Sequence, residues 1–407
     1  MLLDVIQALV GIGVLLLVGF VFSSNRNKIQ WRTVLAALAL QVALAALVLW
    51  VPWGKSVLLS MSNGINNILE YSKEGIEFIF GDLGKMKLGF IFAFHVLPII
   101  IFFSSLIAVL YYLGIMSHVI RVVGGFLHSV LRTSRAESMS ATANVFVGQI
   151  EAPLVIKPYL PQLTRSELFT IMVGGLASVS GSVLAGFASI GVEVKYLIAA
   201  SFMAAPAGLL MAKLLMPEIS KPAENVDVSS EVSEHENVID AAASGAINGL
   251  KLAANIGAVL LAFIGLIALL NGLLGWLGSL VGIDGLSLQM ILSYLFQPIA
   301  WLIGIPWSEA STAGTLIGEK VVINEFVAFL DFVNYKESLS EKTQVILTFA
   351  LCGFANFGSI AVLLGGLGSL VEHRRSEIAR YGLKAVFAGT LANLLSAAIA
   401  GLFFTIA

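Results

Sequence analysis

The chain has 407 residues, of which 58% are apolar and 12% are charged, and its mean hydropathy is +0.94. Soluble domains carry about 25% charged residues, so this composition excludes a water-soluble chain of this length and predicts a protein of the lipid bilayer. The formal net charge of −2 argues against nucleic-acid binding, and the single cysteine, Cys352, excludes an internal disulfide and a thiolate metal cluster.

Eight apolar windows in the sequence are long enough to cross a membrane, which takes about 20 residues in a helix. The predicted spans are residues 2–22, 33–51, 89–113, 168–190, 196–216, 256–280, 345–371 and 383–406. The first window has no basic segment before it and no cleavage signal after it. We therefore interpret it as a retained span rather than a signal peptide.

Basic residues gather in alternate loops between these windows. They are Arg26, Lys28 and Arg32 after the first window, Arg121, Arg132 and Arg135 after the third, and Arg374, Arg375 and Arg380 before the last. By the positive-inside rule, these loops face the cytoplasm. We therefore predict a multi-pass protein of the cell (inner) membrane with both termini on the periplasmic side.

Two polar stretches separate groups of spans. Over residues 58–80, apolar and polar side chains recur at helical spacing, which predicts an amphipathic helix lying along the membrane surface. Residues 217–240 carry seven acids against Lys221 alone, which predicts a flexible cytoplasmic linker.

Two further apolar segments are interrupted near their middle. Residues 138–163 contain the sequence GQIEAP at 148–153, and residues 311–332 contain INEF at 323–326. Each half-segment has about 12 residues, too few at 1.5 Å per residue to cross a hydrocarbon core of about 30 Å. We predict two re-entrant hairpins, whose non-helical tips must line protein or a water-filled cavity.

Each predicted hairpin is followed by a similar glycine-rich run. Residues 175–181 read GLASVSG, and residues 353–359 read GFANFGS. Such runs are poor helix formers, so we expect a broken helix in each half. Because the loop charges place the first hairpin on the cytoplasmic side and the second on the outer side, the repeat is predicted to be inverted. Secondary transporters with inverted repeats hold substrate and ions near the membrane midplane.

The two hairpins carry Glu151 and Glu325, and a carboxylate at membrane depth costs at least a few kcal/mol. The structural alternative is that each glutamate caps a half-helix or pairs with a nearby lysine. The neighbouring amides of Gln149 and Asn324 favour ligand binding instead. No Arg or Lys lies at either predicted tip or in the glycine-rich runs, so an anionic cargo would meet uncompensated repulsion.

The predicted site therefore suits a neutral, hydroxyl-rich molecule, because carboxylates accept hydrogen bonds from hydroxyls and amides both donate and accept. Phe354 offers an aromatic face to a planar ring, although core packing is an equal alternative. The side chains of Asn144 and Ser178, with carbonyls freed by a broken helix, suit a monovalent cation by analogy with other transporters. For Ser178, close helix packing is the alternative.

Three motifs, one in each predicted hairpin and one in the second glycine-rich run, together resemble those of a known family. The sequences GQIEAPLV at 148–155, NEFVA at 324–328 and GFAN at 353–356 resemble the signatures of concentrative nucleoside transporters, and the resemblance extends over essentially the whole chain. The chain looks like the bacterial sodium-coupled branch. The resemblance implies an all-α homotrimer of eight-span protomers with two re-entrant hairpins, interfacial helices, a scaffold and a transport domain that moves like an elevator.

The resemblance also implies a division of the chain and a set of site residues. The scaffold would comprise 1–116 and 246–285, the two transport-domain repeats 117–216 and 286–407, and the acidic linker 217–245. Gln149 and Glu151 would contact the nucleoside base, with Val183 and Phe354 packing around it, and Glu325, Asn356 and Ser359 would bond the ribose hydroxyls. Sodium, the coupling ion, would be held by the side chains of Asn144 and Ser178 and the carbonyls of Val147 and Val179.

Two positions depart from the family pattern. Ile150 and Gly358 stand where many relatives have a hydroxyl-bearing residue, which leaves the preferred nucleosides open. Proton coupling is an alternative to sodium, because Glu325 could carry a proton.

Two other function classes were weighed against transport. A membrane-embedded hydrolase could use Glu151 and Glu325 as acid and base, but the five histidines and Cys352 lie outside both predicted hairpins and form no catalytic constellation with the acids. A passive channel would need weak sites along a continuous path, rather than two converging polar clusters. We therefore expect a secondary transporter and no enzymatic activity.

Overall fold

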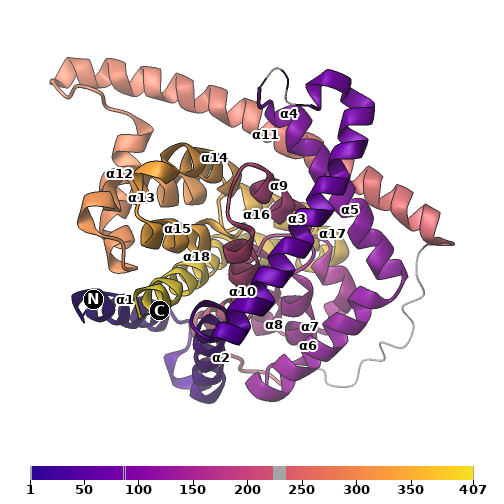
Figure 1. Cartoon of the computed structure of the whole chain (residues 1–407). Coiled ribbons are helices and arrows are strands. Elements are labelled where there is room, and N and C mark those ends of the chain that lie inside the picture. Colours follow the sequence, from indigo (N-terminus) through magenta and orange to yellow (C-terminus); the bar gives the residue numbers. More distant parts are fainter. Residues whose placement is uncertain (1, 86, 88, 223–234, 407) are drawn as a thin grey trace.

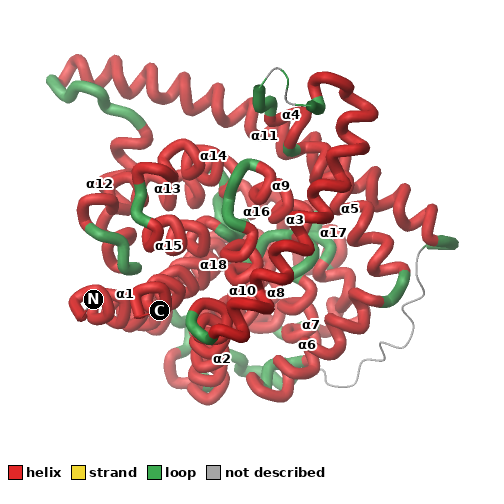
Figure 2. Tube along the Cα trace, viewed as in Figure 1, coloured by secondary structure: helices red, strands yellow, loops and turns green. Residues whose placement is uncertain are grey.

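A computed structural model of the chain describes residues 2–85, 87, 89–222 and 235–406, and Figure 2 shows that this part is built from helices and loops. The first six α-helices are α1 (Leu2–Val21), α2 (Trp31–Leu49), α3 (Pro52–Phe80), α4 (Phe92–His95), α5 (Leu97–Tyr112) and α6 (Ile115–Leu131), with short 3₁₀ turns η1 (Arg26–Lys28) and η2 (Gly81–Leu83). The amphipathic helix expected at 58–80 is α3. It starts at Pro52 because proline is favoured in the first turn of a helix, where its missing N–H is not needed.

The first half of the predicted repeat consists of α7 (Arg135–Ala143), the 3₁₀ segment η3 (Ala152–Gln162), α8 (Arg165–Ala177), α9 (Gly181–Ser189) and α10 (Val194–Leu215). Capping boxes start α7 at Ser134 and α8 at Thr164. The second arm after the interruption is 3₁₀ rather than α-helical, and it contains Pro158 and Pro161, which cannot donate the backbone hydrogen bonds of an α-helix.

A single helix, α11 (Val238–Val281), joins the two halves. It begins inside the segment predicted as linker, because Asn237 caps it by accepting a hydrogen bond from the Asp240 N–H at 2.9 Å. The central part of the predicted linker, 223–234, lies outside the described residues. Figure 1 shows α11 running along the outside of the molecule, where it packs mainly on α5. The contact is close, since a Cβ at Gly249 would lie 2.7 Å from the Ser104 Cβ.

The second half repeats the element order of the first. It contains α12 (Leu288–Leu302), α13 (Trp307–Val322), α14 (Glu325–Tyr335), η4 (Lys336–Ser338), α15 (Glu341–Leu351), α16 (Gly358–Gly365), α17 (Leu367–Leu370), η5 (Glu372–Arg374) and α18 (Arg375–Ile406). The helix breaks expected in both glycine-rich runs are confirmed, because α8 ends at Ala177 before α9 starts at Gly181, and α15 ends at Leu351 before α16 starts at Gly358. The predicted span 345–371 is therefore not one continuous helix.

Seven helical segments in the described part of the chain are long and apolar enough to cross a membrane, or eight if the pair α12 and α13, bent by 118°, counts as one span. Their burial differs sharply. In α8–α9 and in α10, 94% of the apolar window is buried inside the protein, and in α18 83% is buried, against 11% in α11 and 22% in α1. The core therefore lies around α8, α9, α10 and α18, near the centre of the view in Figure 1, while α1 and α11 present apolar side chains outward.

Candidate functional site

The turn between α13 and α14 places Glu325 at the first position of α14. The side chain of Asn324, not that of Glu325, caps this helix by accepting a hydrogen bond from the Val327 N–H at 2.9 Å. The Glu325 carboxylate is therefore free of the capping role that the sequence left open. It is buried, and it lies at the helix end whose dipole stabilises a negative charge.

A chain of hydrogen bonds extends from Glu325 into the break between α15 and α16. The Asn356 Nδ2 donates to Glu325 Oε2 at 2.9 Å, and the Ser359 N–H donates to Asn356 Oδ1 at 2.9 Å. All three residues are buried. The structure thus brings together the three residues that the resemblance assigned to the ribose, with Ser359 joined through its backbone N–H.

The two helix breaks touch each other through their backbones. The Phe354 N–H donates to the Ser178 carbonyl at 3.1 Å, so the break after α15 lies against the break after α8. Each break also contacts the interrupted segment of its own half, because the Gly181 N–H donates to the Phe146 carbonyl and the Phe357 N–H to the Val321 carbonyl. Residues about 175 positions apart in sequence therefore form one polar centre.

Asn393 of α18 holds the two breaks together, and the sequence analysis missed it. Its Nδ2 donates to the carbonyls of Ala177 at 2.7 Å and of Cys352 at 3.1 Å, which end α8 and α15. A Cβ at Gly353 would lie 2.3 Å from Asn393 Oδ1, so only glycine allows this approach. A buried amide within the apolar window 383–406 was the available signal, because intramembrane polar residues face functional interiors.

Lys320 supplies a cation that the tip sequences lack. It is fully buried and its Nζ donates to Asn393 Oδ1 at 2.9 Å. The ammonium also acts electrostatically on the Glu325 carboxylate, although the two form no direct ion pair in the described part of the chain. Glu325 therefore does not pair directly with Lys320. The two groups interact only through the electric field of the lysine charge.

The interrupted segment of the first half carries Gln149 and Glu151. Gln149 is buried against Gly175, because a Cβ added at Gly175 would lie 2.7 Å from the Gln149 Cβ. The Gln149 Oε1 has no hydrogen-bond partner among the described residues. Glu151 is exposed, but its carboxylate folds back toward Gly148, since a Cβ there would lie 2.6 Å from Oε2. Val183 is buried in the first turn of α9.

The residues assigned to sodium lie around the same break. Asn144 is buried, and neither Oδ1 nor Nδ2 of its side chain has a hydrogen-bond partner. It packs against Gly174, whose carbonyl accepts a hydrogen bond from Ser178 Oγ at 2.9 Å. Val147 and Val179 are buried nearby in sequence. An unpartnered amide oxygen beside a hydroxyl and carbonyls is a donor set of hard oxygens, which fits Na⁺.

The described residues offer no alternative metal centre, since no group of three or more His, Cys, Asp or Glu side chains converges there. The site has two polar clusters instead. One is formed by Glu325, Asn356 and Ser359, and the other lies around Asn144 and Ser178. The bond from Phe354 to Ser178 joins them.

Comparisons with known proteins identify the family of the chain. Three family models match: the Na⁺ dependent nucleoside transporter C-terminus at residues 196–401, its N-terminus at residues 10–83, and a nucleoside recognition Gate model at residues 93–193. The nucleoside permease NupC of Helicobacter pylori is 51% identical over 97% of both chains. The sodium/nucleoside cotransporter 1 of Mus musculus is 38% identical over 97% of this chain and 63% of the mouse protein.

Solved structures share the fold over the full chain. An inward-facing, substrate-bound structure of CNTnw has a TM-score of 0.96 at 53% identity and covers 99% of each chain. An outward-facing structure of a CNTnw variant has a TM-score of 0.97 and covers 100% of each chain. The chain therefore belongs to the family of Na⁺-dependent, concentrative nucleoside transporters, whose coupling ion is sodium.

Proposed function

We propose that this chain takes up nucleosides with sodium through one site, formed where the tips of two re-entrant hairpins, α7–η3 and α13–α14, meet. The observation that carries the proposal is the buried chain of hydrogen bonds from Glu325 through Asn356 to Ser359, joined at Phe354 to the first half. Buried carboxylate and amide groups of this kind suit a neutral guest with several hydroxyls.

In this proposal the two halves read the two parts of a nucleoside. The ribose hydroxyls bond to Glu325, Asn356 and Ser359. The base lies against Gln149 and Glu151, with Val183 and Phe354 packing around it. Gln149 supports this assignment because its buried Oε1 lacks a protein partner, and such an atom costs about 1–3 kcal/mol unless a ligand or water satisfies it.

Sodium would bind to the side chains of Asn144 and Ser178 and the carbonyls of Val147 and Val179. The Ser178 residue then takes part in both sites, because its own carbonyl accepts the Phe354 N–H. Ordering this break around the ion orders the residues that pack on the base. Coupling of this kind is reciprocal: sodium strengthens nucleoside binding by the same factor by which the nucleoside strengthens sodium binding.

The proposed movement follows from the difference in burial between helices. We assign the core helices and both hairpins, residues 117–216 and 286–407, to a transport domain whose repeats enter the membrane from opposite faces. The helices with outward apolar faces, within 1–116 and 246–285, would form the scaffold against which it moves like an elevator. Both termini would face the periplasm, and three copies would assemble through the scaffold.

The function is tested with the purified full-length chain in proteoliposomes. Labelled uridine should accumulate inside when sodium is high outside, and accumulation should stop when the sodium gradient is removed at constant pH. Competition by unlabelled nucleosides measures which are preferred, given Ile150 and Gly358. Uptake that follows a proton gradient and ignores sodium would contradict the proposal, as would chemical change of the uridine.

A further inference from the structure

A second polar cavity lies away from the nucleoside site, at the ends of α2, α6 and α10. Its volume is about 560 Å³, and almost all of its lining side chains are polar or charged. The lining includes four basic residues, Arg132, Arg135, Lys213 and Lys221, and two acids, Glu137 and Glu218. A cavity of this size is large enough for a small ligand.

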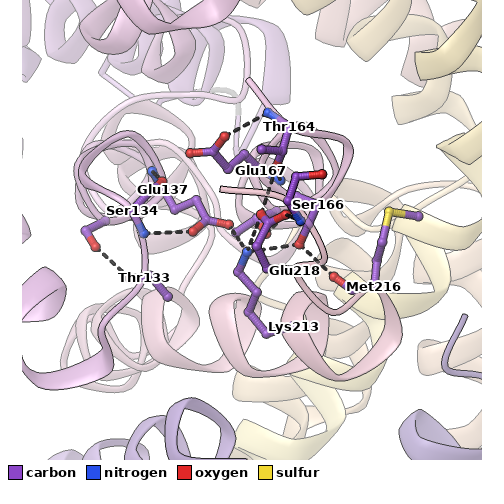
Figure 3. A network of polar contacts seen from close by, with 12 residues as sticks. Thr133, Ser134, Glu137, Thr164, Ser166, Glu167, Lys213, Met216 and Glu218 are labelled. Carbon is purple, nitrogen blue, oxygen red and sulfur yellow. Dashed lines mark hydrogen bonds and ion pairs between the residues drawn. The ribbon is translucent and has the colours of Figure 1, made fainter. Parts of the chain in front are cut away.

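Both acids are already engaged by one of the bases. Figure 3 shows Lys213 between Glu137 and Glu218, and its Nζ forms ion pairs with both carboxylates. The same ammonium donates to Ser166 Oγ at 2.9 Å, and Thr164 Oγ1 donates to Glu218 Oε2 at 2.7 Å. Lys213 therefore balances one of these two negative charges, and both carboxylates point to the ammonium rather than to the arginines.

The two arginines differ from Lys213, because no described residue pairs with them. The side chains of Arg132 and Arg135 are exposed and form no hydrogen bond or ion pair with any described residue. Beside them, His128 Nδ1 bonds to the Thr133 carbonyl at 2.6 Å, which leaves its other ring nitrogen for the cavity. The cavity thus offers two planar guanidinium groups, the side chains best suited to bidentate binding of phosphate.

Arg132 occupies its place at a conformational cost. Its backbone φ is +54°, and among the described residues it is the only one other than glycine with a positive φ. The left-handed conformation costs an L-residue roughly 1–2 kcal/mol, and helices usually end with glycine at such a position. A strained arginine that lines a polar cavity together with a second arginine points to a role in binding rather than in folding.

The place of the cavity points to the source of the ligand. The Ser24 N–H and Oγ both bond to the Leu215 carbonyl, at 2.9 and 3.1 Å, so the basic turn η1 lies at the same end of α10 as the cavity. This is the end that the basic loops place at the cytoplasmic surface. Basic pockets between membrane helices on that side bind the headgroups of anionic lipids.

We propose that this cavity binds a phosphate-bearing anion through Arg132 and Arg135, with the headgroup of an anionic phospholipid as the occupant. The site is separate from the nucleoside site and does not depend on it. Because the cavity lies between α2 and the first repeat, the bound headgroup connects helices assigned to the scaffold and to the transport domain.

The test uses the full-length chain and two probes. Native mass spectrometry measures binding of phosphatidylglycerol, and titration of glycerol 3-phosphate into nanodiscs of phosphatidylcholine measures binding of a soluble phosphate. The variant is Arg132→Gln with Arg135→Gln. Its matched control is Arg121→Gln with Lys251→Gln, which removes two exposed, unpaired positive charges elsewhere. Uridine uptake in phosphatidylcholine vesicles should persist in both, which shows that they are folded.

Loss of the two arginines should weaken phosphatidylglycerol binding about 30-fold, if each contributes as much as a basic residue beside an anionic membrane. The control pair should change it less than about threefold. If glycerol 3-phosphate binds and phosphatidylglycerol does not, and that binding is lost only with Arg132→Gln and Arg135→Gln, the occupant is a soluble phosphate and the lipid assignment is wrong. If the two pairs of substitutions affect both probes equally, or if neither probe binds, the proposal is wrong.

Discussion

Glu325 is the residue on which the proposed ribose contacts depend. It is buried at the start of α14, accepts a hydrogen bond from Asn356, and lies in the field of Lys320. Asn324 caps α14, and of the two Glu325 carboxylate oxygens Oε2 already accepts the hydrogen bond from Asn356. A charged acceptor makes hydrogen bonds to hydroxyls about twice as strong as a neutral one.

Replacing Glu325 by Gln should therefore lower uridine uptake, because a neutral amide accepts more weakly and one of its polar atoms becomes a donor. A loss of about 2 kcal/mol corresponds to roughly a 30-fold fall in kcat/KM for uptake. The control is Glu337→Gln, which removes an exposed acid after the end of the same hairpin. If Glu325→Gln takes up uridine at the wild-type rate, Glu325 does not bind the ribose.

Glu319 is a second buried acid of α13, and its role differs from that of Glu325. It is fully buried, and Gln289 Nε2 donates to its Oε1 at 3.2 Å, while Oε2 has no hydrogen-bond partner. The carboxyl group of Asp331, which is half-buried, lies close enough to form a hydrogen bond with Glu319 and to repel it when both groups are charged. Burial of Glu319 shows that this acid is not solvated.

Glu319→Gln should stabilise the protein, because the amide keeps an oxygen for Gln289, removes the repulsion from Asp331 and adds a donor. A buried polar atom without a partner costs about 1–3 kcal/mol, so we expect a rise of a few degrees in Tm, measured by thermal unfolding in detergent. Glu309→Gln serves as a comparison. Glu309 accepts hydrogen bonds from Ser340, so this substitution should lower the stability of the protein instead. A fall in Tm for Glu319→Gln would show that the charged form is required.

At the scale of elements, the two broken helices form a unit that is held by α18. Broken helices expose carbonyls that an intact helix would satisfy, and such groups need partners inside the membrane. Asn393 provides them by donating to Ala177 and Cys352, and it accepts the hydrogen bond from Lys320. One side chain thus satisfies both helix ends and positions the charge that acts on Glu325.

Asn393→Leu should destabilise the fold strongly, because it leaves two carbonyls and a buried ammonium without partners. The expected loss is about 3–5 kcal/mol, the size seen when a buried charge loses its partner. Thermal unfolding in detergent measures it. Thr405→Val is the control on the same helix, since the hydroxyl of Thr405 bonds only to the Gly401 carbonyl in its own helix, and it should change Tm by little. Equal effects of the two substitutions would show that Asn393 has no special role.

Element boundaries show where sequence reasoning was sufficient. The glycine-rich runs predicted both breaks, because small residues and glycine weaken a helix wherever they occur. The acidic segment predicted a linker over residues 217–240, but the helix begins at Val238 because Asn237 caps it. The segment after the first interruption is the 3₁₀ segment η3, and its prolines account for this form only once the path of the chain is known.

At the scale of the whole molecule, the proposed coupling rests on the contact between the halves. The Asn144 side chain has unpartnered polar atoms beside the break that carries Ser178. The Ser178 carbonyl accepts a hydrogen bond from the N–H of Phe354, two residues before Asn356. In the proposed mechanism, an ion that orders the first half changes nucleoside affinity in the second. Coupling energies between two sites are typically about 1–3 kcal/mol, or 5- to 150-fold.

Asn144→Leu should remove this coupling, because leucine fills the space without an oxygen for the ion. In the wild type, sodium should lower the Kd for uridine by about 5- to 150-fold, measured by calorimetry with sodium or choline salts, and in the variant it should have little effect. Asn271→Leu is a control at a distance, since Asn271 bonds to Gln289 and the Leu288 N–H on α12. Undiminished sodium dependence in Asn144→Leu would exclude it as a ligand.

Composition, apolar windows and charge asymmetry determined by themselves that this is a helical membrane protein with acidic interruptions and two helix breaks. These features are local, since hydropathy, propensity and loop charge belong to short segments. Only the tertiary structure decided that Asn393 bridges both breaks, that Lys320 acts on Glu325, and that two arginines face a cavity beside Lys213. Such contacts join residues tens to hundreds of positions apart, and packing rather than local sequence determines which of them meet.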